Sequence, residues 1–244
     1  MIDTRWEKYS KELDKLDLSN DDWLNSPIIQ RIIVSNNNPY NWVQYWVDLD
    51  KFNEIKSTNR DVCTFVNTAM CLYQLRLMFT NLNYDCYNKT FAPKTIEIGA
   101  GYGNLCRLFK CFFPITHYTI VDTPSMGRLS NHFLGQHKVS FEFWTNEQIS
   151  QMAGIPFDLF ISSFCLSETP KDYCDYVLYN IALNCNDIFI IDGGKGEEKF
   201  IDYLTNFLYA NFDDVKIKNY KCHLFGLKLF IAKKKNNELP EKTT

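Results

Sequence analysis

The sequence predicts an α/β protein with a Rossmann-like, doubly wound sheet and helices on both faces, preceded by a helical N-terminal extension. From residue 94 onward, short apolar segments alternate with amphipathic helical segments, the pattern of parallel strands joined by crossover helices. The first apolar segment runs into a glycine-rich turn. The last two apolar segments are too close together to have a crossover helix between them, so we expect those two strands to pair antiparallel.

The expected strands share short apolar runs that end in acids or turn residues. They cover residues 94–98, 117–122, 139–143, 157–163, 187–192, 215–220 and 227–232. The run at 157–163 is almost continuously apolar, as a buried parallel strand should be.

Capping and turn residues set the limits of the expected helices. The first helix carries its apolar stripe over residues 105–112, and Pro124 opens a second helix that runs toward Gly135. Asn146 is expected to cap a short helix that Gly154 ends. A further helix begins at Thr169-Pro170, and another covers residues 197–209.

Residues 1–90 are expected to form a helical extension, residues 91–235 the sheet domain, and residues 236–244 a polar, flexible tail. Four of the five tryptophans lie in the extension, at Trp6, Trp23, Trp42 and Trp46. We expect these rings to anchor the extension to the core as a lid. Stacking of the rings on a flat or ring-shaped acceptor is the alternative.

Composition limits the classes of partner. The chain has 244 residues and a net charge of −3, which argues against a nucleic-acid surface held mainly by electrostatics. Nine cysteines without any Cys-x-x-Cys pair indicate reduced, packed thiols. Neither a signal peptide nor an apolar run of spanning length appears, so a soluble cytoplasmic protein without a membrane partner is expected. The sequence leaves the oligomeric state open.

The glycine-rich turn after the first strand predicts a ligand site. Gly99, Gly101 and Gly103 fall at alternate positions, whereas a dinucleotide fingerprint needs its third glycine one position later. Glu97 lies two residues before Gly99, and Asp122 ends the second strand, where a carboxylate can accept both ribose hydroxyls of an adenosine. Taken separately, a glycine-rich turn often has no ligand, and an aspartate at a strand end is often only the cap of the next helix. Their order and spacing together favour a cofactor site at the carboxyl edge of the sheet.

Three segments carry a family resemblance: Glu97-Ile-Gly-Ala-Gly-Tyr-Gly103, Tyr118-Thr-Ile-Val-Asp-Thr-Pro124 and Phe157-Asp-Leu-Phe-Ile-Ser-Ser-Phe-Cys-Leu-Ser-Glu168. The first resembles the opening motif of class I S-adenosylmethionine (SAM) methyltransferases. The Asp-x-Pro after the second strand and the Leu-Ser-Glu after the fourth resemble the sugar O-methyltransferase family. The general resemblance covers about residues 90–235. It implies SAM as cofactor and a seven-stranded sheet in the order 3-2-1-4-5-7-6.

The resemblance also implies a set of cofactor-binding residues. Glu97, Gly99 and Gly101 should line the methionyl part of SAM, and Asp122 should bind the ribose. Asn146, near the end of the third strand, is the candidate for the adenine amino group, with Glu147 beside it either sharing that role or standing as an exposed helix acid. Ser163, at the end of the fourth strand, completes the set.

Transfer of a methyl group to a hydroxyl calls for a base that takes the hydroxyl proton. Glu168, Asp192 and His223 follow strands that should end at the acceptor side, and they are the catalytic candidates in that order. Each also has a purely structural alternative. Glu168 could be an acid that precedes a helix, Asp192 could close a turn with Gly193, and His223 could be a loop histidine whose hydrogen bonds are all made within the chain. Glu168 and Asp192 could also supply oxygen ligands to a divalent metal, but no dense Asp, Asn or His cluster appears, so no metal is expected.

Three functions stay open at this point. The first is a SAM-dependent O-methyltransferase acting on a sugar or glycan precursor. The second keeps the reaction but uses a phenol, a carboxylate or a protein side chain as acceptor. The third is a non-catalytic partner subunit with a SAM-binding fold. A nicotinamide dehydrogenase is the least favoured, because the third glycine is misplaced and no Tyr-x-x-x-Lys occurs.

Overall fold

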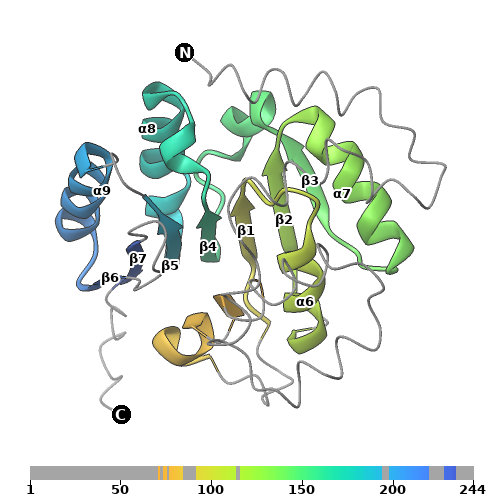
Figure 1. Cartoon of the computed structure of the whole chain (residues 1–244), viewed down its shortest axis with the longest axis horizontal. Helices are drawn as coiled ribbons and strands as arrows, with labels where there is room; N and C mark the ends of the chain where they lie inside the picture. The colour runs from red at the N-terminus through yellow and green to blue at the C-terminus, as the bar shows by residue number, and fades with distance from the viewer. Residues whose placement is uncertain are drawn as a thin grey trace, which may run out of the picture.

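The computed structural model describes residues 71, 74–75, 77–84, 92–113, 116–193, 198–219 and 228–234. It contains a seven-stranded sheet of order β3-β2-β1-β4-β5-β7-β6 (Figure 1). The predicted α/β class and the strand order implied by the resemblance are therefore confirmed. The four tryptophans of the extension, His223 and the C-terminal tail lie outside the described residues.

The strands are β1 (Thr95–Ile98), β2 (Tyr118–Asp122), β3 (Glu142–Thr145), β4 (Phe157–Ser163), β5 (Cys185–Asp192), β6 (Asp214–Asn219) and β7 (Lys228–Lys233). The α-helices are α6 (Asn104–Phe112), α7 (Pro124–Gln136), α8 (Lys171–Asn180) and α9 (Glu198–Asn211). The 3-10 turns are η2 (Asn146–Met152), η3 (Leu166–Glu168) and η4 (Ala182–Asn184). We use the name pre-sheet helix for the helical residues 71, 74–75 and 77–82, which precede β1.

The five leading strands run parallel, and the closing pair is antiparallel. β1 pairs with β2 and β4, β2 with β3, and β4 with β5, all in parallel. β7 pairs antiparallel with both β5 and β6, as the short link between the last two expected strands predicted. All five parallel strands therefore end at one edge of the sheet, here called the carboxyl edge, and begin at the opposite amino edge.

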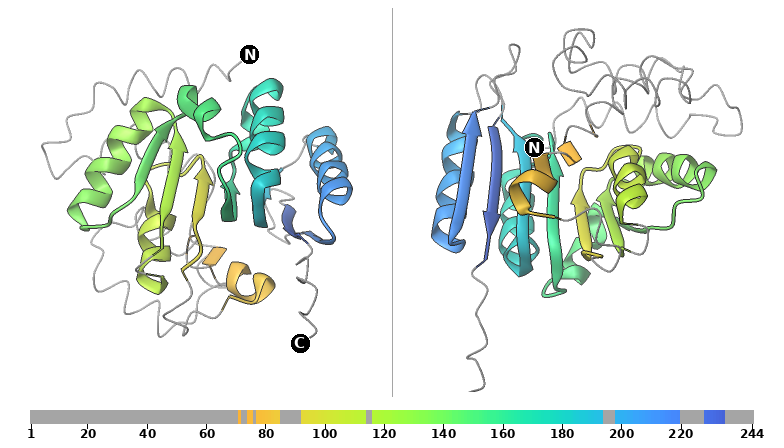
Figure 2. Two further views of the ribbon diagram at one scale, coloured as in Figure 1. Left: turned by 180° about the vertical axis from the view of Figure 1, so that it is seen from behind. Right: turned by 90° about the horizontal axis from the view of Figure 1, so that it is seen from below.

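Helices cover both faces of the sheet (Figures 1 and 2), and a cluster of buried apolar side chains lies on each face. The pre-sheet helix, α6 and α7 pack on one face, against side chains such as Leu159 and Ile161. The turn η2 and helices α8 and α9 pack on the other, against Ile96 and Phe160. Because successive strand residues point to opposite faces, Phe160 belongs to one layer while its two neighbours on β4 belong to the other.

Three expected boundaries were wrong. The third strand is shifted toward the C-terminus, to Glu142–Thr145, because it pairs only with β2 and its first partner there is Thr119. Asn146 is not the cap of the next helical turn: Thr145 is the N-cap and forms a capping box with Gln148. Similarly, Pro170 is the N-cap of α8 rather than its first helical residue.

Two further findings concern the cysteines and the helices of the described residues. The six cysteines that the structure describes are free. No helix within the described ranges combines the length and the apolar character needed to cross a bilayer.

Candidate functional site

The glycine loop links β1 to α6 at the carboxyl edge of the sheet. Its backbone is left-handed at Gly99 (φ 76°) and at Gly101 (φ 59°). A Cβ at Gly99 would lie 2.4 Å from the Cys165 Sγ, so this position admits no side chain without displacing the loop after β4. At Gly101 the nearest atom to a built Cβ is the Met126 Cε at 3.7 Å, so the left-handed backbone, rather than crowding, requires glycine there.

Asp122 joins the glycine loop to the end of β2. Its Oδ2 accepts a hydrogen bond from the Gly101 backbone N–H at 3.0 Å, and its Oδ1 accepts one from the Thr123 N–H at 2.7 Å. Burial raises the pKa of Asp122 to about 6, although these two bonds lower it. A carboxylate has about four acceptor positions, so two remain for ligand hydroxyls. The predicted pairing of the glycine turn with Asp122 is thus present as a direct contact.

Glu97 lies below the glycine loop on the face covered by α6. Its side chain is 3% exposed, and its Oε2 accepts a hydrogen bond from the Tyr118 hydroxyl at 2.8 Å. Burial raises the pKa of Glu97 to about 7, the Tyr118 bond lowers it, and the nearby charge of Asp122 raises it. A cation bound near this carboxyl would favour its ionised form.

The segment after β4 crosses the end of β1. Phe164 has a left-handed backbone (φ 57°), which is strained for a residue other than glycine. Its N–H donates to the Ile191 carbonyl at 2.8 Å, which holds the turn against β5. The next residue, Cys165, packs on Gly99, and its thiol pKa lies well above the ordinary range. Burial is the main cause, followed by the charges of Asp122, Asp192 and Glu168, so three carboxyl groups surround this thiol.

Asp192 is held by the turn η3. Its side chain is 1% exposed. Its oxygens accept hydrogen bonds from the Ser167 hydroxyl at 2.5 Å, the Ser167 N–H at 3.1 Å and the Gly193 N–H at 2.7 Å. Burial nevertheless raises its pKa. This arrangement positions the turn that carries Glu168, which itself is only half-buried.

Asn146 lies where β3 ends. The residue is half-buried, but its Oδ1 is fully buried and has no hydrogen-bond partner among the described residues. A buried oxygen without a donor is unfavourable, so this atom is suited to accept a hydrogen bond from a ligand. Its neighbour Glu147 is exposed. The amide therefore fits an adenine amino group better than the acid does.

The structure brings the candidates on β1, β2, β4 and β5 to the carboxyl edge, as the parallel order requires. Ser163 lies at the end of β4, where its hydroxyl donates to the Gln74 Oε1 at 3.4 Å. His223 lies outside the described residues. Within the described ranges, no three His, Cys, Asp or Glu side chains are grouped as they would be to hold a metal ion.

Three residues of the site were not among the candidates from the sequence: Tyr118, Ser167 and Gln74. A signal existed for Tyr118, because it starts β2 opposite Thr95 and alternation then puts its ring on the same face as Glu97. No comparable signal existed for Ser167, whose contact with Asp192 depends on the shape of a three-residue turn. Gln74 could have been noticed as a polar residue within an apolar helical stripe.

Comparison with known proteins supports the fold. No family model and no curated protein sequence matches the chain. Among solved structures, an O-methyltransferase family protein from Burkholderia thailandensis superposes with a TM-score of 0.52 at 14% identity, covering 94% of this chain and 72% of that one. A candidate RNA methyltransferase from Pyrococcus horikoshii gives 0.50 at 13% identity, covering 96% and 100%.

A third similar structure, a candidate O-methyltransferase from Nostoc punctiforme, has a TM-score of 0.47 at 13% identity; the match covers 69% of this chain and spans 60% of that protein's length. Identities this low establish shared architecture and nothing about substrate. Together with the strand order and the glycine loop, the two stronger similarities show that this chain has the Rossmann-like fold of the methyltransferases.

Proposed function

We propose that this protein is a SAM-dependent methyltransferase that methylates a hydroxyl group of a small molecule or glycan precursor. The observation that carries the proposal is the contact between Asp122 and the Gly101 N–H, which joins the glycine loop to the end of β2. It occurs within a sheet of the methyltransferase strand order. A site of this kind suits a ribose, and its acidic surroundings suit a cation.

The residues present fit SAM along its length. Asp122 keeps acceptor positions for the ribose hydroxyls, and the buried Oδ1 of Asn146 can accept from the adenine amino group. Glu97, at the other side of the glycine loop, can attract the ammonium group, because opposite charges favour each other strongly where water is excluded. When bound, SAM supplies an electrophilic methyl group.

The chain's own residues would then orient the acceptor and take up its proton. We assign the base to Glu168, because it is half-buried, follows β4 at the carboxyl edge and lies close enough to Cys165 for its charge to raise the pKa of that thiol. Asp192 is less suited, since hydroxyl and backbone N–H donors already occupy its oxygens. Its contribution is to hold η3 and hence the position of Glu168. His223 remains a further candidate from the sequence alone.

A sugar hydroxyl as acceptor is supported by the Asp-x-Pro motif at Asp122 and the Leu-Ser-Glu motif ending at Glu168, which resemble those of sugar O-methyltransferases. Both motifs lie at the carboxyl edge in the structure, at the N-terminus of α7 and in η3.

Calorimetry with SAM and with its demethylated product tests the cofactor. We expect micromolar binding of both by the full chain and loss of binding in Gly101→Arg, whose side chain would enter the loop. Gly135→Arg is the matched control, because a side chain at this exposed helical position meets no atom within 4 Å. Absence of binding by the unaltered protein would overturn the proposal.

A labelled-methyl screen over sugars, phenols, carboxylates and protein substrates tests the acceptor. Transfer to a sugar that is lost in Glu168→Gln, with SAM affinity kept, is the expected result. Transfer only to a non-sugar would replace the sugar as acceptor. A protein that binds SAM but transfers its methyl group to none of these classes would point instead to a partner subunit.

A further inference from the structure

Gln74 is a buried polar residue on the apolar side of the pre-sheet helix, where packing alone would favour an apolar side chain. The described buried residues of this helix are Cys71, Gln74, Leu75, Met78 and Leu82, and all but Gln74 are apolar. Gln74 is only 6% exposed. Placing an amide in an apolar stripe is unfavourable unless its polar atoms have partners, so this residue calls for a reason.

Within the described ranges, Gln74 forms one side-chain hydrogen bond, and this bond uses its amide oxygen. Its Oε1 accepts from the Ser163 hydroxyl at 3.4 Å, which is long for an O–H···O bond. Its Nε2 carries two donors. No acceptor for either donor lies among the described residues. The amide therefore presents N–H groups at the end of β4.

The position of this amide is fixed by the sheet. Ser162 pairs with Ile98, so Ser163 comes level with Gly99, at the start of the glycine loop. Ser163 and Glu97 project from the same face, because Glu97 pairs with Ile161, two residues before Ser163. Gln74 thus lies beside the glycine loop, on the face of the sheet that also holds Glu97.

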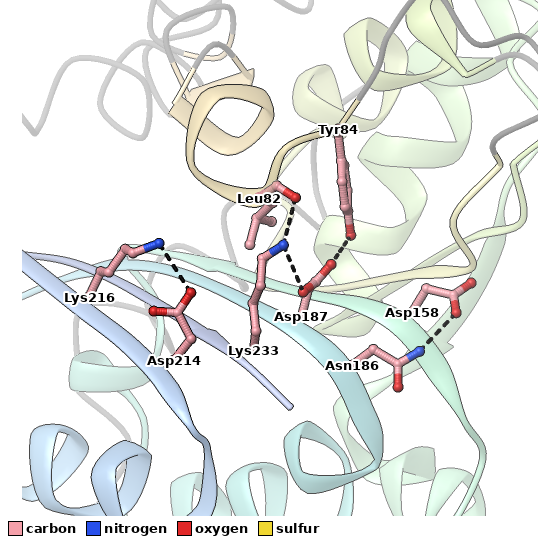
Figure 3. Close-up of polar contacts among 8 residues, drawn as sticks. All are labelled: Leu82, Tyr84, Asp158, Asn186, Asp187, Asp214, Lys216 and Lys233. Carbon is pink, nitrogen blue, oxygen red and sulfur yellow. Dashed lines mark hydrogen bonds and ion pairs between the residues drawn. The ribbon is translucent and has the colours of Figure 1, made fainter. Parts of the chain in front are cut away.

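The far end of the pre-sheet helix is anchored at the amino edge. The Lys233 Nζ donates to the Leu82 carbonyl at 2.7 Å, and the Tyr84 hydroxyl donates to the Asp187 Oδ2 at 2.8 Å (Figure 3). These contacts join the end of the helix to β7 and β5. Because both ends of the described helix are in contact with the sheet, Gln74 is held in one place along it.

The sheet order defines which end of the cofactor reaches Gln74, given the proposed function. Asp122 and Asn146 place the adenosine end over β2 and β3. The amino-acid end then extends in the other direction, over β1 and β4. That end carries an ammonium group, which Glu97 suits, and a carboxylate, which needs N–H or O–H donors.

We propose that the Gln74 amide, together with the Ser163 hydroxyl, binds the carboxylate of SAM. The carboxyl groups of Glu97, Asp122 and Asp192 cannot take this role when ionised, because they accept hydrogen bonds and repel an anion. Gln74 supplies uncharged donors at the same edge. The pre-sheet helix is thereby a part of the cofactor site and not only a cover for the core.

The test compares SAM with decarboxylated S-adenosylmethionine, which keeps the ammonium and the sulfonium but lacks the carboxylate. Calorimetry on the full chain should show that Gln74→Met weakens SAM binding about tenfold or more. The same variant should change binding of the decarboxylated compound less than about twofold. Ser163→Ala should shift the two affinities in the same sense by a smaller factor.

Asn81→Ala is the matched control on the same helix. Asn81 precedes Leu82, whose carbonyl accepts from Lys233 at the amino edge, and its own Oδ1 accepts from the Lys218 Nζ at 2.6 Å. Its loss should therefore leave the ratio of the two affinities unchanged. Thermal unfolding of each variant checks that it is folded. If Gln74→Met weakens both compounds equally or neither, this inference is wrong while the proposed function stands. If the unaltered protein binds neither compound, both fall together.

Discussion

Both edges of the sheet carry acids that are buried or half-buried, but the hydrogen-bond partners of these acids differ between the edges. At the amino edge, Asp187 accepts from the Tyr84 hydroxyl and has the Lys233 Nζ 3.9 Å from its Oδ1 (Figure 3). Asp158 nearby accepts from the Lys94 N–H at 2.7 Å and from the Asn186 amide at 3.2 Å. The acids of this edge bind segments of the chain to each other.

At the carboxyl edge, Glu97, Asp122 and Asp192 accept only from hydroxyls and backbone N–H groups within the described part of the chain. None of these three acids has a Lys, Arg or His partner there. Burial raises the pKa of all three. In the proposed function, the ammonium and the ribose of SAM would be the partners of the acids at this edge, whereas the acids of the amino edge are already paired with the chain.

The largest expected effect, and the sharpest test of the difference between the two edges, is that of Asp122→Ala on SAM affinity. Two hydrogen bonds from ribose to a carboxylate should be lost, so SAM affinity should fall by about 1,000-fold, or roughly 4 kcal/mol. Asp187→Ala at the amino edge should instead lower the free energy of unfolding and leave SAM affinity unchanged. Calorimetry and urea titration on both variants decide the matter. Loss of affinity in Asp187→Ala at unchanged fold would erase the distinction between the edges.

A second effect concerns stability. The pKa of Glu97 is about 7 in the folded protein against an ordinary value of 4.5, so the folded state holds this proton more tightly than the unfolded state. The stability linked to it is present below pH 4.5 and is lost as the pH rises through about 7. Glu97→Gln should therefore stabilise the ligand-free protein at pH 8, by up to about 3 kcal/mol, and change it little at pH 4.5.

Urea titrations of the Glu97→Gln variant at both pH values measure this difference. The same variant should bind SAM more weakly, because the ammonium loses its carboxylate partner. A variant that is less stable than the unaltered protein at pH 8 would show that Glu97 supports the fold rather than the ligand. Gain of stability with loss of affinity would place Glu97 firmly in the carboxyl-edge group.

Much of this fold follows from the sequence because its signals are local. The continuous apolar run of β4 predicted both of its limits, Phe157 and Ser163, and the acid after the second run predicted the end of β2 at Asp122. The third strand was placed wrongly since Val139 and Phe141, although apolar, pack against the core outside the ladder with β2. Which apolar residues enter a ladder depends on the partner strand, and one sequence does not show that.

The contacts of the site likewise fall into those that local sequence signals predict and those that depend on tertiary packing. The contact between Gly101 and Asp122 was expected, because two strand ends in a parallel sheet meet at one edge. The contact of Gln74 with Ser163, far away in sequence, depends on how a helix lies across the sheet. The hydrogen bond from Ser167 to Asp192 likewise depends on the conformation of the turn η3. Because of this bond, we propose that Asp192 positions Glu168 and does not act as the base.

The smallest expected effects are changes in the free energy of unfolding on substitution of residues at the amino edge, and they rank the contacts there. Tyr84→Phe removes a hydrogen bond to a carboxyl group whose side chain is only 16% exposed, so the free energy of unfolding should fall by about 1 kcal/mol. Lys216→Ala removes an ion pair with Asp214 at 3.1 Å, but these side chains are 46% and 52% exposed. Water screens such a pair, so stability should change by less than about 0.5 kcal/mol. Urea titrations would contradict this ranking if the Lys216 variant lost as much stability as the Tyr84 variant, and SAM affinity should stay constant in both.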